Sequence, residues 1–365
     1  MTGSVRSRVS RVLEPHGLEW GLAPLASLPV EGREDRVRSW TADGLHGTMD
    51  WLAKSIESRI RPQVQWPWAR SFLVVELPYD LPAAVAPGSR PEVAGYARGR
   101  DYHYRLDGRL KAIASDLEAE FPGLRTFQFC DDQHLPEVEL AVAAGLGWRG
   151  RNTLLVTRKG SAFHLGGLLL SLEDVDVPPP HPDHCGSCTA CLDACPTGAF
   201  LEPGRIDASR CLSHWSIEDR HTTENVAARS ARSEVFGCDI CQQVCPWNRR
   251  ILTENVLPGG WPGTWEEWTD ICRPGGGFQS LFTKTPLRRA GRHKMLRNLL
   301  RALWNTDPAR AATLARRALG TETYPSLVEW MRSRLEPGPS PDLTLTRNDN
   351  PGIPGKEPPC KPTSV

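Results

Sequence analysis

The sequence carries almost no net charge, has no long apolar run and shows no secretory leader. Its 44 Lys and Arg nearly balance 43 Asp and Glu, giving a formal net charge of +1, so any surface for nucleic acid must be local. No apolar run approaches the roughly 18 residues of a membrane span. The N-terminal stretch MTGSVRSRVSRVLEPHG has no apolar core of the secretory type. The 365 residues therefore predict two or three domains that are neither membrane-spanning nor exported.

Cysteine, by contrast, is plentiful and concentrated in one stretch. One run has the pattern C-x2-C-x2-C-x3-C-P, a second has C-x2-C-x3-C-P, and one further Cys lies between them. The positions are Cys185, Cys188, Cys191, Cys195, Cys211, Cys238, Cys241 and Cys245. Eight thiolates are the number that two [4Fe–4S] clusters need.

The spacing divides these thiolates into two sets. In two-cluster proteins the last Cys of each run ligates the cluster of the other run. The first set is then Cys185, Cys188, Cys191 and Cys245. The second set is Cys238, Cys241, Cys195 and, by elimination, Cys211. Two adjacent clusters more often carry electrons than only hold a fold, so we expect an electron path, with a structural pair as the alternative.

Other interpretations of the cysteines explain less of the pattern. A disulfide framework is typical of small secreted domains, which this long chain does not resemble. Zinc favours two separated C-x2-C pairs and leaves the triple run unexplained, and a thioredoxin-like site needs only one pair. Cys130, Cys272 and Cys360 lie outside the runs and are expected to be ordinary thiols. Clusters of this kind imply a reducing cytoplasm.

The stretch before the cysteines predicts a mixed α/β domain. Residues 71–79 (SFLVVELPY) form a short apolar run of the kind found in buried strands. Residues 106–121 carry Leu and Ile at helical spacing, which predicts an amphipathic helix. Residues 152–157 and 167–172 are expected to be further strands, whereas residues 1–70 have a mainly helical pattern.

The segment GLGWRG formally matches the dinucleotide fingerprint G-x-G-x-x-G through Gly145, Gly147 and Gly150. That fingerprint needs a strand before it and a helix after it. Here the pattern predicts a helix before it and a strand after it, so we reject nicotinamide binding. The glycines are expected instead to allow a close backbone approach at a tight turn.

After the cysteines the chain becomes basic and helical. Residues 284–305 contain no acid and hold Lys284, Arg288, Arg289, Arg292, Lys294, Arg297 and Arg301. Leu residues at helical spacing predict a helix, whose basic face is either an ordinary solvated surface or one that contacts phosphates. Residues 306–335 suit one or two helix pairs of a short solenoid. Residues 336–365 are Pro-rich, which predicts a disordered tail.

The chain resembles the epoxyqueuosine reductases from about residue 45 to about residue 305. The segments are LHGTMDWLAK, YARGRDYH, DDQHLPEVELAVAAGLGWRGRNTLL, CGSCTACLDACPTGAF, RCLSHWSIE, FGCDICQQVCPWN and TPLRRAGRHKMLRN. YARGRDYH and GLGWRGRNT are more specific than the cysteine runs. The resemblance implies an α/β cobalamin-binding catalytic domain (1–175), a ferredoxin-like two-cluster module (176–255), HEAT-like tRNA-binding helices (256–335) and a tail (336–365).

Members of this family reduce epoxyqueuosine to queuosine at the wobble position of tRNA with cobalamin and two [4Fe–4S] clusters. The resemblance implies the same reaction here, in a cytoplasmic monomer that takes electrons from an external low-potential donor. It implies base-off cobalamin, because the segment D-x-H-x-x-G is absent. It also implies contacts to the anticodon stem-loop by Arg288, Arg289, Arg292, Lys294 and Arg297.

The family's proton donor is an Asp before the GLGW segment, which corresponds to Asp131, with Asp132 as the reserve. Removing an epoxide oxygen needs two electrons and a proton, and a buried carboxyl with a raised pKa would hold that proton. The alternative is that Asp131 caps a helix beginning near His134. The other residues that the resemblance places in the cobalamin or substrate pocket are Lys54, Tyr96, His103, Arg151 and Asn152.

Some positions depart from the family pattern near the expected cofactor and substrate: Lys54, Arg151, Ala162, Gly167, His214 and Trp215. Lys54 and Arg151 keep the positive charge but change the geometry of its donors. Two other functions fit part of the sequence. A corrinoid iron–sulfur reductase for another substrate, such as a halogenated compound or an epoxide, would have no use for the basic helix. A non-catalytic ferredoxin-like carrier would not need the α/β domain.

Overall fold

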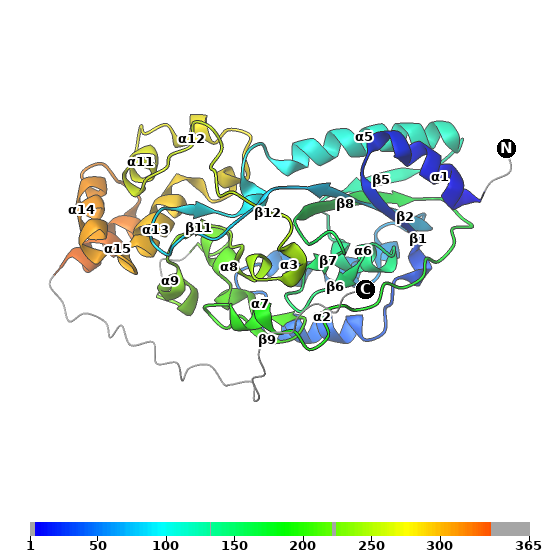
Figure 1. Ribbon diagram of the computed structural model, residues 1–365, viewed down its shortest axis with the longest axis horizontal. Coiled ribbons are helices and arrows are strands. Elements are labelled where there is room, and N and C mark those ends of the chain that lie inside the picture. Colours follow the sequence, from blue (N-terminus) through cyan, green and yellow to red (C-terminus); the bar gives the residue numbers. More distant parts are fainter. Residues whose placement is uncertain (1–3, 132, 221–223, 337–365) are drawn as a thin grey trace.

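The computed structural model describes residues 4–131, 133–220 and 224–336. The α/β domain lies at one end of an elongated molecule and the last helices lie at the other (Figure 1). The short elements of the cysteine stretch, coloured green, lie between these ends along one side. Among the described residues, no helix is long and apolar enough to cross a membrane.

An antiparallel sheet with the strand order β1-β2-β8-β5 forms the centre of the α/β domain. The strands are β1 (Glu19–Pro24), β2 (Ser71–Pro78), β8 (Phe163–Leu170) and β5 (Thr126–Phe129). β2 and β8 pair along their whole length, from Ser71 opposite Leu170 to Pro78 opposite Phe163. Both strands are covered on both faces, which explains why their sequences are mostly apolar instead of alternating, with Ser71, Glu76 and His164 as buried polar exceptions.

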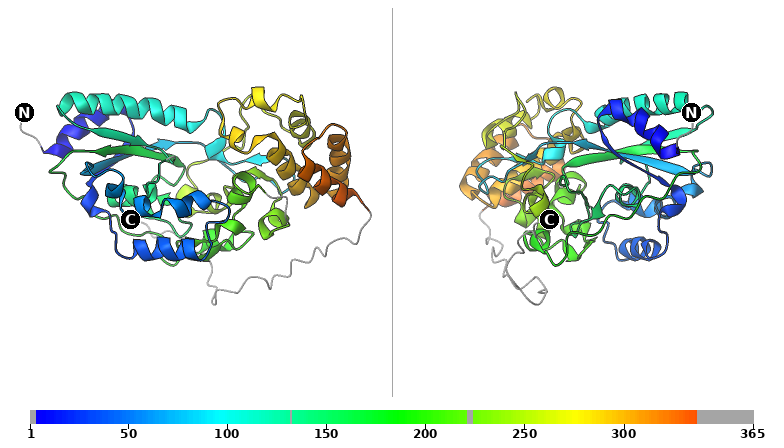
Figure 2. Two further views of the ribbon diagram at one scale, coloured as in Figure 1. Left: turned by 180° about the vertical axis from the view of Figure 1, so that it is seen from behind. Right: turned by 45° about the vertical axis from the view of Figure 1, so that its right-hand side comes forward.

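Helices cover both faces of this sheet, because successive side chains of a strand point to opposite sides. α1 (Val5–Leu13) and α5 (Tyr102–Glu120) pack on the face that carries Leu73 and Val75. α6 (Glu137–Ala143) packs on the opposite face, against Phe72 and Val74. Figure 2 shows from behind that α5, at the top, lies on one side of the sheet.

The strand predicted at 71–79 and the helix predicted at 106–121 are confirmed. The helical prediction for residues 1–70 is only partly right, because β1 lies among α1, α2 (Arg33–Ala42), α3 (Asp50–Lys54) and α4 (Ile56–Ile60). The strand predicted at 152–157 shortens to β7 (Leu155–Val156), which pairs with β6 (Trp148–Arg149). The strand predicted at 167–172 corresponds to β8, which begins before residue 167 and ends at residue 170.

The GLGWRG segment turns tightly after α6 and runs into β6, with β7 following, so the predicted helix before it and strand after it are confirmed. A Cβ on Gly147 would lie 2.2 Å from the carbonyl oxygen of Val156. A Cβ on Gly150 would lie 2.6 Å from Asn152 Oδ1 and 2.8 Å from the Val156 side chain. The close approach that these glycines allow is therefore to their own hairpin.

The cysteine stretch folds into short elements. They are α7 (Ala190–Asp193), β9 (Phe200–Glu202), β10 (Arg205–Ile206), α8 (Leu212–Ile217), α9 (Val226–Ser230), β11 (Glu234–Phe236), α10 (Ile240–Gln243) and β12 (Leu252–Thr253). β11 pairs in parallel with β4 (Glu92–Val93), and β12 pairs in parallel with β3 (Leu81–Pro82). These two pairings fasten the cysteine stretch to the α/β domain.

The C-terminal part consists of helices packed around α13. They are α11 (Trp265–Ile271), α12 (Phe278–Leu281), α13 (Gly291–Trp304), α14 (Pro308–Leu319) and α15 (Pro325–Leu335). α13 shares one hydrophobic core with α8, α9 and β11, so the helices are continuous with the cysteine stretch. The predicted helices of residues 306–335 are confirmed as α14 and α15. The part of the predicted tail beyond Glu336 lies outside the described residues.

Two positions that depart from the family pattern lie in packed cores. A Cβ on Gly167 would lie 2.1 Å from the carbonyl oxygen of Leu73 and 2.6 Å from the Phe129 ring, so strand packing requires glycine there. Trp215 is 1% exposed in the core that α8 shares with α13. Packing alone therefore accounts for Gly167 and Trp215, and their nearness to the cofactor or substrate stays a prediction.

Candidate active site and cluster sites

The first predicted thiolate set is brought together in the structure. The pKa of Cys191 is raised to about 12, first by burial and then by the nearby charges of Cys245, Cys185 and Cys188. The pKa of Cys245 is also raised by burial and by Cys185 and Cys188. Thiols separated by more than fifty residues in the sequence therefore interact, in the grouping that the spacing predicts.

The second set shows the same mutual influence. Burial raises the pKa of Cys241, and Cys211, Cys191 and Cys195 raise it further. Burial and then Cys241 raise the pKa of Cys238. Because Cys191 of the first set also contributes to the raised pKa of Cys241, the two sets are neighbours. Among the residues that the structure describes, no group of three or more His, Cys, Asp or Glu converges as for a single metal ion.

Hydrogen bonds reach sulfurs of both sets. The Trp148 indole Nε1 donates to Cys185 Sγ at 3.3 Å. In the second set, the backbone N–H of Ala199 donates to Cys195 Sγ at 3.4 Å, and Thr197 Oγ1 lies 3.3 Å from the same sulfur. The sequence pattern did not point to Trp148 or Thr197, since spacing shows ligands but not the donors around them. Four partly buried thiols per set with such donors fit two [4Fe–4S] clusters.

Asp131 lies between β5 and α6 with a φ of 45°, an uncommon value for a residue other than glycine. Its Oδ1 lies 2.8 Å from His103 Nε2, and its Oδ2 accepts a hydrogen bond from the Tyr102 hydroxyl. Its own N–H donates to Glu137 Oε1 at 2.5 Å. α6 begins only at Glu137, after Pro136, so Asp131 does not cap a helix. Asp132 lies outside the described residues.

His103 is placed by the first turn of α5. Asp101 is the N-cap of that helix, and its Oδ1 accepts the backbone N–H of His103 at 3.0 Å. The same oxygen lies 2.7 Å from His103 Nδ1. One imidazole is thus held between two carboxylates, those of Asp101 and Asp131. Asp101 is a site residue that sequence reasoning missed, although a capping Asp before a helix is a readable signal.

The charges of this group differ from the expectation. Burial alone would raise the pKa of Asp131, but hydrogen bonds from His103 and Tyr102 outweigh it and the pKa is lowered. The hydrogen bond to Asp131 is the largest cause that raises the pKa of His103 to about 9. The prediction that Asp131 itself holds a proton at neutral pH is therefore wrong. The proton resides on His103, and Asp131 is its carboxylate partner.

Aromatic rings form a wall beside this pair. Tyr102 stacks on His164 with the ring centroids 4.1 Å apart and an interplanar angle of 10°. Tyr96 meets Tyr102 and His164 edge-on at 6.4 Å and 6.5 Å. Burial lowers the pKa of His164 to about 4, so this ring is neutral at pH 7. His164 was not predicted, because nothing in the β8 pattern distinguishes it from a core residue.

A polar network connects the α/β domain to the cysteine stretch near this wall. The Tyr79 ring lies 5.0 Å from that of His164, and Gln242 Nε2 donates to the Tyr79 hydroxyl at 3.1 Å. Ser161 Oγ donates to Gln242 Oε1 at 3.0 Å. Gln242 directly follows Cys241 in the sequence. A continuous path of contacts therefore leads from Asp131 to a predicted cluster ligand.

The remaining predicted pocket residues have other surroundings. Lys54 is exposed at the end of α3. Asn152 is buried, and its Oδ1 accepts the backbone N–H of Leu154 at 3.4 Å. The carbonyl of Arg151 accepts the backbone N–H of Gly204 from the cysteine stretch at 2.9 Å. The contacts thus unite Tyr96, His103 and Asp131, whereas Asn152 bonds within the β6–β7 turn and Arg151 bonds to the cysteine stretch.

Some side chains of the basic segment are exposed, and others are held in ion pairs or hydrogen bonds within the protein. Arg288 and Arg289 are exposed, and Arg289 pairs with Glu218 at 2.8 Å. Arg289 also lies near enough to help lower the pKa of Asp131. Arg292 pairs with the fully buried Glu322 side chain, and Lys294 donates to the carbonyl of Ile217.

Arg297 is the clearest correction in this segment. It is 5% exposed, and its guanidinium donates to the carbonyls of Trp215 at 2.8 Å and Asp219 at 2.9 Å. The prediction that it contacts tRNA is wrong for this conformation, because phosphate cannot reach a buried guanidinium. Arg297 instead joins α13 to α8.

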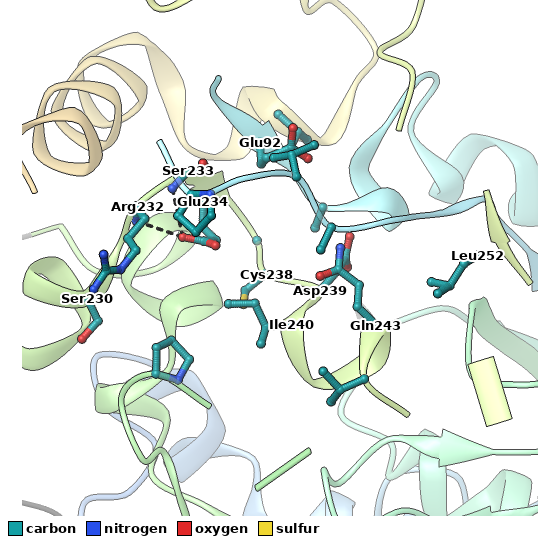
Figure 3. Close-up of a pocket in the computed structure, with 18 residues that line it drawn as sticks. Glu92, Ser230, Arg232, Ser233, Glu234, Cys238, Asp239, Ile240, Gln243 and Leu252 are labelled. Carbon is teal, nitrogen blue, oxygen red and sulfur yellow. Dashed lines mark hydrogen bonds between the residues drawn. The ribbon is translucent and has the colours of Figure 1, made fainter. Parts of the chain in front are cut away.

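A cavity of about 370 Å³ lies beside Cys238 of the second set (Figure 3). Val93, Ile240 and Leu252 contribute apolar walls. Asp239, which accepts the Gly95 N–H at 2.7 Å, lines it as well. None of the predicted pocket residues lines this cavity. It is therefore separate from the Asp131 site.

The fold and the two thiolate sets define a class: an α/β protein with a double iron–sulfur module. The sequence matches the family described as 4Fe-4S double cluster binding domain over residues 184–248, and that described as Epoxyqueuosine reductase QueG, DUF1730 over residues 59–132. The epoxyqueuosine reductase of Pseudomonas aeruginosa is 34% identical over 357 residues, covering 90% of this chain and 95% of that protein. The epoxyqueuosine reductase of Escherichia coli is 33% identical over 82% of each. This chain belongs to the epoxyqueuosine reductase family.

Solved structures support the fold. Epoxyqueuosine reductase from Streptococcus thermophilus superposes with a TM-score of 0.77 at 24% identity, over 92% of this chain and 91% of that one. A crystal structure of epoxyqueuosine reductase with an epoxyqueuosine-modified tyrosine tRNA stem loop superposes with a TM-score of 0.78 at 24% identity, over 91% of this chain and 90% of that one.

Proposed function

We propose that this protein reduces epoxyqueuosine to queuosine at the wobble position of tRNA. The observation that carries the proposal is the His103–Asp131 pair, joined by a path of contacts through Tyr102, His164 and Tyr79 to the residue that follows Cys241. A proton source and an electron source thus adjoin one site. Relatives that share a third of their residues across nearly the whole chain bear the name of this activity.

We take cobalamin, bound base-off, to be the cofactor of this site. When bound, it would supply a low-valent cobalt nucleophile, and the clusters would supply single electrons. The stacked rings of His103, Tyr102 and His164, with Tyr96 edge-on, form an aromatic surface beside Asp131 that suits a large organic macrocycle better than a bare metal ion. His164 is neutral at pH 7 and adds no charge to this wall.

The protein's own task at the epoxide is to deliver a proton. The oxygen that leaves the carbon must be protonated, and a positioned acid lowers the barrier for that step by general acid catalysis. His103 stores the proton between Asp101 and Asp131, and Asp131 faces it as the carboxylate through which the proton passes. Asp131 is the proposed catalytic residue, and His103 and Asp101 are positioning residues.

The tRNA surface that we propose is smaller than the whole basic segment. Arg288 and Arg289 are exposed, and Arg289 lies close enough to Asp131 to lower its pKa, where a backbone phosphate beside the modified base would lie. An anticodon loop is already single-stranded, so turning its base into a pocket costs little. We assign this contact to the helical part 256–335 and keep the parts 1–175 and 176–255 as the catalytic and cluster domains.

Turnover on isolated tRNA that contains epoxyqueuosine tests the function. The full chain is reconstituted anaerobically with iron, sulfide and cobalamin and supplied with a low-potential reductant, and queuosine is read by mass spectrometry of the digested tRNA. Product that depends on cobalamin is expected. If both clusters and cobalamin are bound and no queuosine forms, the substrate is a different one and the proposal is wrong.

Turnover should fall as the pH rises through about 9, because His103 loses its stored proton there. Above that pH each further unit should reduce the rate about tenfold. The same pair stabilises the fold most fully below the ordinary histidine pKa of about 6.5, and this contribution disappears as the pH passes about 9. Single-turnover rates between pH 6 and 10 measure the effect. His103→Gln, which has no titrating ring, should lose this alkaline decline; an unchanged decline would exclude His103 as its source.

A further inference from the structure

The indole of Trp148 is aimed at a predicted cluster ligand in the neighbouring module. Its Nε1 lies 3.3 Å from Cys185 Sγ, and the side chain is 2% exposed. Trp148 pairs with Val156 in the β6–β7 hairpin, and Gly147 admits the close approach of that hairpin. The hairpin therefore sets the direction of the indole independently of cluster binding.

Aromatic rings enclose this hydrogen bond. The ring centroids of His181, His184 and Trp247 lie 5.1 Å, 5.0 Å and 5.1 Å from that of Trp148. His184 directly precedes Cys185, and Trp247 lies two residues after Cys245, so the rings cover ligands of the same set. They cover one side of the partly buried Cys185, and a hydrogen bond is electrostatically stronger where the local dielectric is low.

We propose that Trp148 raises the reduction potential of the cluster held by Cys185, Cys188, Cys191 and Cys245. Reduction adds one electron to the cluster, forms and breaks no bond, and increases the negative charge on its sulfurs. A fixed N–H donor stabilises that added charge, and hydrogen bonds to sulfur are among the features that set cluster potentials. This inference rests on the cluster assignment within the proposed function and adds a tuning role for one tryptophan.

The consequence for the protein is that the α/β domain controls an electron step in the cysteine stretch. Trp148 belongs to β6, the element after α6, and α6 follows Asp131 in the sequence. In the second set the donors to Cys195 come from Thr197 and Ala199, within the cysteine stretch itself. Only the first cluster therefore takes a sulfur hydrogen bond from the α/β domain, among the contacts of the described residues.

Trp148→Phe tests the proposal, because it keeps an aromatic ring and removes the N–H. The full chain, with both clusters reconstituted, is titrated with dithionite and redox mediators and read by electron paramagnetic resonance. At a fixed potential the ratio of reduced to oxidised first cluster should fall about tenfold, which equals about 59 mV for a one-electron couple. The second cluster should keep its potential.

Trp247→Phe is the matched control, since it alters the same aromatic enclosure and leaves the N–H of Trp148 in place. It should leave both potentials unchanged. If Trp148→Phe shifts neither cluster or both alike, or if Trp247→Phe gives the same shift, the proposal is overturned. Should Trp148→Phe fail to retain its cluster, replacing the Trp148 side chain by benzothienylalanine keeps its shape without an N–H and decides between the outcomes.

The titration of the wild-type protein tests the cluster assignment separately from the role of Trp148. Two cluster signals in the wild type with an unchanged potential in the variant would reject the role of Trp148 alone. A wild type that shows fewer than two clusters would reject the cluster assignment, and the tuning role with it. Neither readout depends on tRNA turnover.

Discussion

Asp131→Asn is expected to slow turnover on epoxyqueuosine-containing tRNA by about 10²–10⁴-fold, the usual contribution of a positioned acid or base. Asn has nearly the same shape as Asp, so the clusters and cobalamin should stay bound. What disappears is the carboxylate that accepts from Tyr102 and faces His103 Nε2. Single-turnover assays with matched iron and cobalamin contents measure the loss.

The same variant has a readout that does not depend on turnover. The hydrogen bond to Asp131 is the largest cause of the raised pKa of His103, about 9. Without it the pKa of His103 should return toward the ordinary 6.5, which proton NMR of the ring follows. Asp116→Asn, at an exposed carboxylate of α5 that pairs with His16, is the control and should change neither quantity. Full activity of Asp131→Asn would remove Asp131 from the mechanism.

The thiolate sets could be predicted from sequence because their spacing encodes their geometry. Cluster ligands recur at short fixed intervals, and the order within each run indicates which Cys ligates the cluster of the other run. The mutual influence of Cys191 and Cys245 agrees with this grouping. The donors around the sulfurs come from distant turns and leave no such signal, as Trp148 shows.

The charge state of Asp131 could not be predicted, because it depends on partners that only the fold supplies. His103 lies 28 residues earlier in the sequence, on α5, and meets Asp131 at the end of β5. Burial without partners raises the pKa of a carboxyl, and that was the basis of the expectation. With a protonated imidazole and a tyrosine hydroxyl in contact, the sign reverses.

The strand β1 was missed for a related reason. Its segment Glu19–Pro24 contains a glycine and a proline and has no alternation that would reveal a strand. The strand forms because it pairs with β2, with Leu22 opposite Leu73. Tertiary contact, not local preference, determines this edge of the sheet.

Arg297→Met and Arg289→Met should separate the structural and the tRNA-binding parts of the basic segment. Arg297→Met is expected to lower the free energy of unfolding by about 3 kcal/mol, because it leaves buried carbonyls and the buried Asp219 without the cation. Arg289 is half-exposed, so Arg289→Met should change stability by less than about 1 kcal/mol. Denaturation of the reconstituted proteins measures both.

The affinity for tRNA should show the reverse order. Losing one phosphate contact at Arg289 should reduce the slope of log affinity against log salt by about 1, because one fewer counterion is released on binding. Arg297→Met, once folded, should keep the wild-type slope, since a guanidinium that donates to Trp215 and Asp219 releases no counterion from tRNA. A stable Arg297→Met protein with a reduced slope would mean that α13 opens to expose Arg297 when tRNA binds. The burial of one arginine thus decides whether a dense basic sequence is a binding surface or the joint between two modules.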